Sequence, residues 1–195
     1  AYNGLGYSNG KVNSTDGSYI HVSVSDNVGV KEIKVEISPK DAAVWTVVGT
    51  QTGTDLQWQS FLLSVLESFD DGQYDVKVTA TDYYGNSTAT QFVITLDNTL
   101  PAAPAMSVEP RPGKVKVSYT VSPDDTDIER FRIYYRLASE EIYNHYVDYA
   151  AEFNPSTYYI DLRNETGKAY AFKMVAIDKA GNHSADSNVF TATVG

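Results

Sequence analysis

The strongest constraint on this chain is one pattern that occurs twice, at equivalent points of two otherwise dissimilar halves. A segment of alternating apolar and polar residues begins at Tyr74 and again at Tyr170, 96 residues further on. Each segment runs into an Asp-x-x-Gly-Asn sequence, at 82–86 and 178–182, where glycine and asparagine tolerate the positive φ of a tight turn. A repeat of about 100 residues is too long for a solenoid unit and fits one β-sandwich. The sequence therefore predicts two β-sandwiches in tandem.

Alternation elsewhere in the chain indicates further strands and an all-β fold. We expect strands over 18–25, 31–37, 44–48, 74–81 and 91–96 in the first half, and over 115–121, 128–137, 158–162 and 170–177 in the second. A period of two places every second side chain on one face of a sheet. Residues 56–69 are richer in leucine and alternate less, so we expect a strand that passes into a short helical turn there.

The boundary between the two halves lies at the sequence Asp-Asn-Thr-Leu-Pro-Ala-Ala-Pro. We expect a first domain over 1–97, a linker over 98–104 and a second domain over 105–195. Pro101 and Pro104 stiffen the connection and prevent strand pairing there. So short a linker predicts a rod with limited bending. The sequence begins without a signal peptide, which suggests a mature segment of a longer protein.

Charge and composition exclude several classes of function. The 195 residues carry a formal net charge of −10 with a pI near 4.6, and the 15 basic residues are scattered. This argues against nucleic acid as a partner, because phosphate binding needs a clustered basic face. No apolar run approaches the roughly 20 residues of a membrane span, so we expect no membrane insertion. The absence of cysteine excludes disulfides and zinc–thiolate sites, and it favours a bacterial source. We expect a monomer.

The two halves resemble two known families. Residues 102–195 resemble a fibronectin type III domain through Ile160-Asp-Leu162, the alternating strand from Tyr170 and the turn that follows it, although Tyr119 stands where that family usually has tryptophan. Residues 1–97 resemble bacterial Ig-like domains of surface proteins through 24–30 and 71–86. This resemblance implies spacers and ligand-presenting modules, rarely catalytic, of bacterial adhesins, surface-layer proteins and secreted polysaccharide-degrading enzymes. It also implies a secreted or cell-surface location.

Acidic residues are the first candidate site. In an Ig-type sandwich the loop after the second strand and the loop before the last strand share the pole where the chain enters, so the second domain gathers carboxylates beside the linker. The predicted set is Asp97, Asp124, Asp125, Asp127, Asp178 and Asn182. Several carboxylates with an amide oxygen suit Ca²⁺, which takes 6–8 oxygen ligands. A smaller set in the first domain is Asp26, Asp82 and Asn86. The alternative, which we favour, is that each aspartate accepts backbone N–H groups in its own turn.

Aromatic residues are the second candidate site. Tyrosine, tryptophan and phenylalanine make up 12% of the chain, and exposed rings on a sandwich face can stack on sugar rings. The candidates are Trp45, Trp58, Tyr83, Tyr84, Tyr143, Tyr146 and Tyr149. The alternative, which we favour, is that a tryptophan fills the core and the tyrosines are ordinary strand residues. Tyr83 and Tyr84, in a turn, fit that alternative least well.

Catalysis has little support in the sequence. His21, His145 and His183 have no metal-ligand spacing, and the adjacent Glu140 and Glu141 point in different directions on an extended chain. No phosphate loop, dinucleotide fingerprint or nucleophile elbow occurs. We therefore expect a non-catalytic spacer or presentation module that requires no cofactor, with Ca²⁺ as the open question. Its partners would be neighbouring domains of the same polypeptide. The alternative function is a module that binds polysaccharide or protein through exposed aromatic residues.

Overall fold

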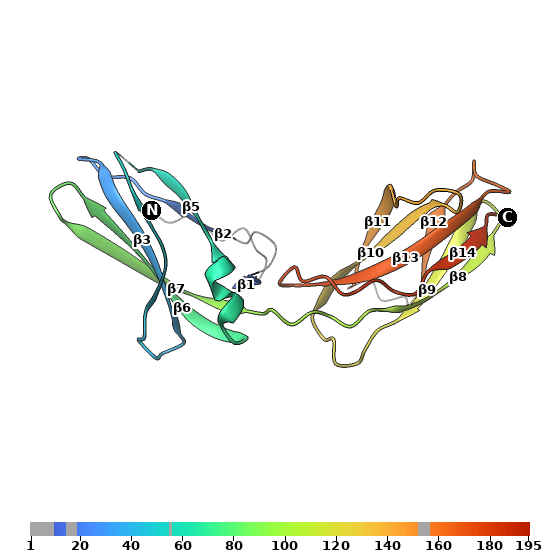
Figure 1. Cartoon of the computed structure of the whole chain (residues 1–195), viewed down its shortest axis with the longest axis horizontal. Helices are drawn as coiled ribbons and strands as arrows, with labels where there is room; N and C mark the ends of the chain where they lie inside the picture. Colours follow the sequence, from blue (N-terminus) through green and yellow to red (C-terminus); the bar gives the residue numbers. More distant parts are fainter. Residues whose placement is uncertain (1–9, 15–18, 55, 152–156) are drawn as a thin grey trace. The chain divides into compact units, whose positions relative to one another are not determined.

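The computed structural model describes residues 10–14, 19–54, 56–151 and 157–195. The chain divides into two compact units, Ala1–Thr99 and Leu100–Gly195. Each unit consists of strands arranged in two sheets (Figure 1). Each also has its own hydrophobic core, so each is described by itself below. Across the described ranges, no helix has the length and apolar character needed to cross a membrane.

The first unit packs a small sheet on a large one. The large sheet has the order β1-β7-β6-β3-β4, and the small sheet is the pair β2-β5. The strands are β1 (Lys11–Val12), β2 (Tyr19–Ser23), β3 (Val30–Pro39), β4 (Thr46–Thr52), β5 (Trp58–Leu62), β6 (Gly72–Asp82) and β7 (Ser87–Leu96), and a 3-10 helix, η2 (Leu63–Ser68), follows β5. The strand and helical turn expected over 56–69 thus correspond to β5 and η2.

Alternation in the sequence explains the core of the first unit. Ile33, Val35 and Ile37 of β3 are fully buried, and Val76 and Val78 of the neighbouring β6 are buried beside them. From the small sheet, the inward residues of β2 and β5 close this core, and leucines of η2 complete it. An apolar side chain at every second position therefore fixes which face of each strand turns inward.

The second unit packs a three-stranded sheet on a four-stranded one. The sheets have the orders β12-β9-β8 and β11-β10-β13-β14. The strands are β8 (Ala105–Arg111), β9 (Lys114–Thr120), β10 (Ile128–Leu137), β11 (His145–Ala150), β12 (Thr157–Asp161), β13 (Ala169–Asp178) and β14 (Phe190–Thr193). Phe131 and Ile133 of β10 meet Phe172 and Met174 of β13 in the core, and all four side chains are buried. The all-β fold is confirmed.

Candidate functional surfaces

The repeated Asp-x-x-Gly-Asn turn forms one hydrogen-bond network in both units. In the first unit, Asp82 Oδ1 accepts the N–H groups of Tyr84 and Asn86, both at 2.8 Å, and Asp82 Oδ2 accepts the Asn86 amide at 2.7 Å. Gly85 takes a φ of 86°, in the left-handed region where glycine is favoured. The Asn86 side-chain hydrogen bond holds the pKa of Asp82 below its ordinary value of 3.8, and backbone N–H bonds add to this against the opposing effect of desolvation.

The second copy repeats these contacts atom for atom. Asp178 Oδ1 accepts the N–H groups of Ala180 and Asn182 at 2.8 Å, and Asp178 Oδ2 accepts the Asn182 amide at 2.8 Å. Asp178 is 1% exposed, against 8% for Asp82. In both turns the carboxylate therefore accepts hydrogen bonds from its own loop. This agrees with the alternative in which each aspartate stabilises its own turn.

The predicted calcium residues of the second unit come together only in part. The carboxylates of Asp127 and Asp178 have oxygens within 4.8 Å of each other. Asp125 Oδ2 instead accepts the N–H of Ala102 at 3.1 Å, and Asp124 is exposed in the same loop. Asp97 belongs to the first unit, where it forms an ion pair with Lys11 at 3.0 Å. Calcium at this set stays a prediction.

The smaller acidic set meets at one hollow of the first unit. Asp26, Asp82 and Asn86 all line a depression of about 200 Å³. Asp26 is exposed, and its Oδ1 accepts the N–H of Val28 at 2.8 Å. Asp26 and Asp82 thus each use a carboxylate oxygen to accept backbone N–H groups of their own turns. A cation at this hollow also stays a prediction.

Hydrogen bonds anchor the chain close to both ends of the predicted linker. In the first unit, Asp71 accepts the N–H of Asn98 at 2.7 Å and the hydroxyl of Thr99 at 2.6 Å. In the second unit, the bond from Ala102 to Asp125 is the corresponding anchor. Leu100 and Pro101 are the residues between the two anchors. The segment predicted as a linker over 98–104 thus holds residues that are bonded into one unit or the other.

Candidate aromatic residues of the first unit lie mainly outside the core. Trp58 is 60% exposed, and its ring stacks on His21 with a centroid distance of 5.2 Å. His21 in turn stacks on Tyr19 at 6.0 Å and hydrogen-bonds Ser60 Oγ through Nδ1 at 2.9 Å. The expectation that a tryptophan fills the core is wrong for Trp58, because its pairing with Ser23 of β2 places it on the outer face of the small sheet.

Two of the other aromatic candidates of the first unit, Trp45 and Tyr83, each make a polar contact through the side chain. Trp45 carries the ammonium group of Lys77 at 4.2 Å from its ring centroid. Tyr83 is 47% exposed and donates its hydroxyl to the carbonyl of Gly53 at 2.7 Å. Tyr84 is 81% exposed, the highest value among the exposed large apolar side chains of the described residues. Trp58 and Tyr84 are therefore the most accessible of the rings predicted to stack on a ligand.

The outer face of β10, β11 and β13 interleaves tyrosines with cations. Tyr146 is 57% exposed, and the Arg132 guanidinium lies 4.3 Å from its ring centroid. Tyr143 lies between Arg136 and Lys173, at 4.9 Å and 4.8 Å. Sequence reasoning missed these cations. The alternation of Arg130, Arg132, Tyr134 and Arg136 on one strand is the signal that would have found them.

An ion pair lies on that outer face, whereas one of the predicted tyrosines lies on the opposite face. Arg132 makes a bidentate ion pair with Asp148, with N–O distances of 2.7 and 2.8 Å, and the Arg132 hydrogen bond lowers the pKa of Asp148. Tyr149, predicted to stack on a ligand, instead faces inward. It stacks on Tyr158 at a centroid distance of 3.9 Å and packs against the core, because its partner on β10 is the inward Phe131.

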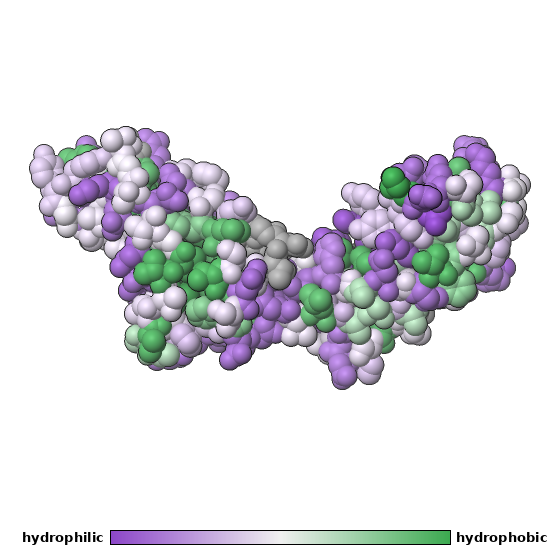
Figure 2. Space-filling view, in the orientation of Figure 1, coloured by the Kyte–Doolittle hydropathy of each residue, from purple (hydrophilic) through white to green (hydrophobic). Residues whose placement is uncertain are grey.

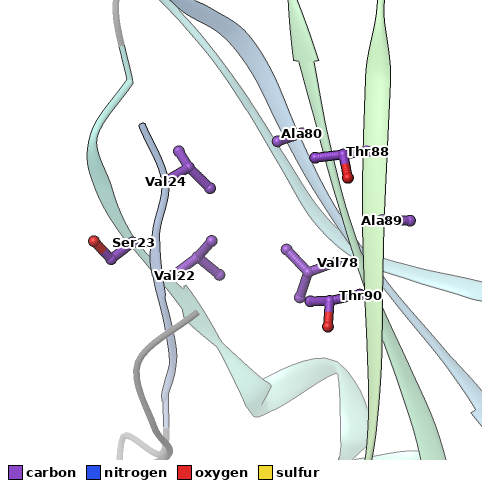
Figure 3. Close-up of a pocket in the computed structure, with 8 residues that line it drawn as sticks. All are labelled: Val22, Ser23, Val24, Val78, Ala80, Thr88, Ala89 and Thr90. Atoms are coloured by element: carbon purple, nitrogen blue, oxygen red, sulfur yellow. The ribbon is translucent and has the colours of Figure 1, made fainter. Parts of the chain in front are cut away.

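A groove opens along the first unit between β2 and the β6–β7 hairpin. Its volume is about 280 Å³. Figure 3 shows Val22 of β2 and Val24, just after β2, pointing toward Val78, Ala80 and Thr90, while Ser23 and Ala89 point away. The depression at the Asp82 turn shares Val24 and Ala80 with this groove, so the two are continuous. Figure 2 shows hydrophobic residues gathered on the visible face of the first unit.

Comparison with known proteins identifies the fold. No protein-family profile matches the sequence. No curated protein matches it either. Among solved structures, the chain is similar to the chicken CNTN1 FN1–FN3 domains, with a TM-score of 0.71 and 17% sequence identity over 95% of this chain. The chain spans 65% of the length of that one. This likeness shows the fold, a tandem of Ig-like/fibronectin type III-like β-sandwiches.

Proposed function

We propose that this chain is a non-catalytic spacer and presentation module of a larger bacterial secreted or cell-surface protein. Its work is mechanical: it holds neighbouring domains of the same polypeptide apart. The observation that carries the proposal is the pair of anchors at the domain boundary. Thr99 is bonded into the first unit and Ala102 into the second, so two residues separate two independently cored sandwiches.

A short connection restricts bending for two physical reasons. Few free backbone dihedrals lie between the anchors, and one of the two residues there is Pro101, whose φ is fixed by its ring. The conformational entropy available to such a connection is small. A spacer that keeps its neighbouring domains at a fixed distance needs a connection with little conformational freedom. A flexible tether would instead need a longer linker rich in glycine and serine.

Small-angle X-ray scattering tests the proposal directly. We expect the double substitution Pro101→Gly and Pro104→Gly to broaden the distribution of interdomain distances and to lower the mean. A second variant, Asp71→Ala, removes the anchor of Asn98 and Thr99 and should act in the same direction. Pro112→Gly, in the β8–β9 connection of the second unit, is the matched control. Scattering profiles that stay unchanged in both linker variants would contradict the spacer role.

A second candidate function is carbohydrate binding by the first unit. The observation that favours it is the exposure of Trp58, whose ring is held in place by stacking on His21. A pre-positioned ring loses little side-chain entropy when it stacks on the apolar face of a sugar. Tyr84, at 81% exposure, is the other accessible ring of this unit.

Affinity electrophoresis in gels that contain plant or bacterial polysaccharides tests this candidate. We expect retardation of the parent chain and its loss in Trp58→Ala. Tyr146→Ala serves as the control, since it removes an exposed ring from the other unit. A broad polysaccharide panel without retardation, or retardation that survives Trp58→Ala, would count against carbohydrate binding through this ring.

A further inference from the structure

The outer face of β2 and β5 in the first unit is formed by three cross-strand pairs. The pairs are Tyr19 with Leu62, His21 with Ser60, and Ser23 with Trp58. The residues between them, such as Ile20 and Phe61, are buried in the core, which places the three pairs on the opposite side of the sheet. None of the six outer side chains is a carboxylate, an ammonium or a guanidinium group. The face is therefore a surface without permanent charge.

Three of these side chains form one continuous stack of rings. Tyr19 lies on His21 with a centroid distance of 6.0 Å and an interplanar angle of 18°, and His21 lies on Trp58 at 5.2 Å and 16°. The middle ring is also fixed from the other strand, because His21 Nδ1 and Ser60 Oγ form a hydrogen bond of 2.9 Å. The two end rings are accessible, with 38% of Tyr19 and 60% of Trp58 exposed. The stack thus holds two exposed rings in one orientation.

The lack of charge on this face contrasts with the composition of the first unit. Its 99 residues include 12 acidic and 5 basic side chains. A polyanion would be repelled by this net negative charge, and it would meet no cation among the six outer side chains of β2 and β5. An uncharged ligand meets neither obstacle. The electrostatics of the unit therefore favour a neutral ligand on this face.

A neutral polysaccharide has the chemistry that this face can bind. The apolar side of a sugar ring stacks on an aromatic ring, and Leu62, 43% exposed, adds apolar surface opposite Tyr19. The hydroxyls of Ser23 and Ser60 can both donate to and accept from sugar hydroxyls. Because the exposed rings are at the two ends of the stack, a ligand that contacts both must extend over more than one sugar unit.

We propose that the outer face of β2 and β5 is a binding platform for an extended, uncharged polysaccharide. Trp58 and Tyr19 are its stacking residues, and His21 is a positioning residue that holds both rings. Rings that are fixed before binding lose less side-chain entropy when the ligand binds. The platform presupposes the carbohydrate binding proposed above for the first unit, and it assigns to that function a ligand class, a second stacking ring and a positioning residue.

A glycan array tests the ligand class. The printed polymers are uncharged glucans, xylans and mannans, and the anionic polymers polygalacturonate, alginate and carboxymethyl cellulose. We expect binding to at least one uncharged polymer and to none of the anionic ones. Equal or stronger binding to an anionic polymer would overturn the neutral ligand class. Absence of binding to every polymer would overturn both the platform and the carbohydrate-binding function.

Substitutions in the stack test the platform on the polymer that binds. Tyr19→Ala and His21→Ala should each weaken binding by about tenfold, the size expected for the loss of one aromatic contact. His21→Phe should restore the affinity of the parent chain, because phenylalanine keeps the stack. Tyr159→Ala, which removes a 52% exposed ring from the second unit, is the matched control and should bind as the parent chain does. The first-unit midpoint should not move, because the stack lies outside the core.

The same variants separate the platform from the simpler function. If Trp58→Ala abolishes binding while Tyr19→Ala and His21→Ala bind as the parent chain does, carbohydrate binding through Trp58 stands and the platform is overturned. A loss in His21→Ala that His21→Phe does not restore would overturn the positioning role. Ligand length supplies a test on the unsubstituted chain: a hexasaccharide of the bound polymer should bind about tenfold more tightly than its disaccharide, since only the longer one reaches both rings. Equal affinities would overturn the extended ligand.

Discussion

The two sandwiches share a turn and a repeat, yet they close their small sheets differently. In the second unit, β8 pairs with β9 over seven residue positions, and the small sheet has three strands. Among the described residues of the first unit, the small sheet is the pair β2-β5, and a groove of about 280 Å³ lies beside β2. The second unit has a hollow of about 240 Å³ beside Tyr119 and Phe131, at the end of its aromatic stack.

The difference shows that the conformation of the turn does not depend on how many strands the small sheet has. The Asp-x-x-Gly-Asn turn is built from contacts within five residues, so it forms alike in both units. The small sheets differ, and each depends on a pairing between strands about 40 residues apart, β2 with β5 in the first unit and β9 with β12 in the second.

Core truncation should destabilise one unit at a time. Phe172→Ala removes a fully buried ring from the second unit and should lower its free energy of unfolding by about 3–5 kcal/mol. Ile33→Ala should lower that of the first unit by about 2–5 kcal/mol. Scanning calorimetry with two resolved transitions measures both. If either substitution shifted both transitions equally, the two cores would not be independent.

Removal of the turn carboxylate should affect the second unit more than the first. Asp178→Ala leaves two buried N–H groups without their acceptor and should cost about 2 kcal/mol. Asp82→Ala should cost less, because Asp82 is more exposed and water can replace the lost bonds. Chemical denaturation of each variant supplies the comparison. A larger loss in the first unit would show that burial does not set the strength of this turn.

Acid should weaken both units through carboxylates whose folded-state pKa is lowered. Asp82 in the first unit and Asp148 in the second have pKa values below the ordinary 3.8. Such groups stabilise the folded state fully above the unfolded pKa, and the contribution is lost as the pH falls below about 4. We expect the midpoint of the first unit to depend less on pH below about 4 in Asp82→Asn, and that of the second unit in Asp148→Asn. Unaltered acid profiles in these variants would assign acid sensitivity to other groups.

Calcium should produce the smallest effect, because the aspartates of both turns already accept hydrogen bonds from their own loops. We expect the two midpoints to agree within error between about 2 mM Ca²⁺ and excess EDTA. Occupancy at about 100 times Kd would add about 2.7 kcal/mol and raise a midpoint by several degrees. A rise in either transition would establish a calcium site. Asp127→Asn would then show whether the pair formed by Asp127 and Asp178 holds the ion.

Much of the fold was predictable because it depends on local pattern. The strand over 128–137 was predicted at its observed bounds, and η2 follows β5 as its leucine-rich sequence suggested. The strands β1, β8, β11 and β14 were not predicted. They are edge strands of their sheets in which at most one residue is buried, so the apolar alternation that marks a strand in the sequence is weak in them.

The candidate surfaces were less predictable because strand register decides them. Trp58 and Tyr149 gave similar signals in the sequence, yet Trp58 faces out and Tyr149 faces in. A shift of one residue in pairing exchanges the two faces of a strand, and nothing local fixes that shift on an edge strand. The tandem repeat, the two turns and most inward positions could be predicted from the sequence, since these depend on neighbours in the chain. The exposure of the rings, the contacts between tyrosines and the cations of β10 and β13, and the position of the groove depend on strand pairing, which brings together residues that are separated in the sequence.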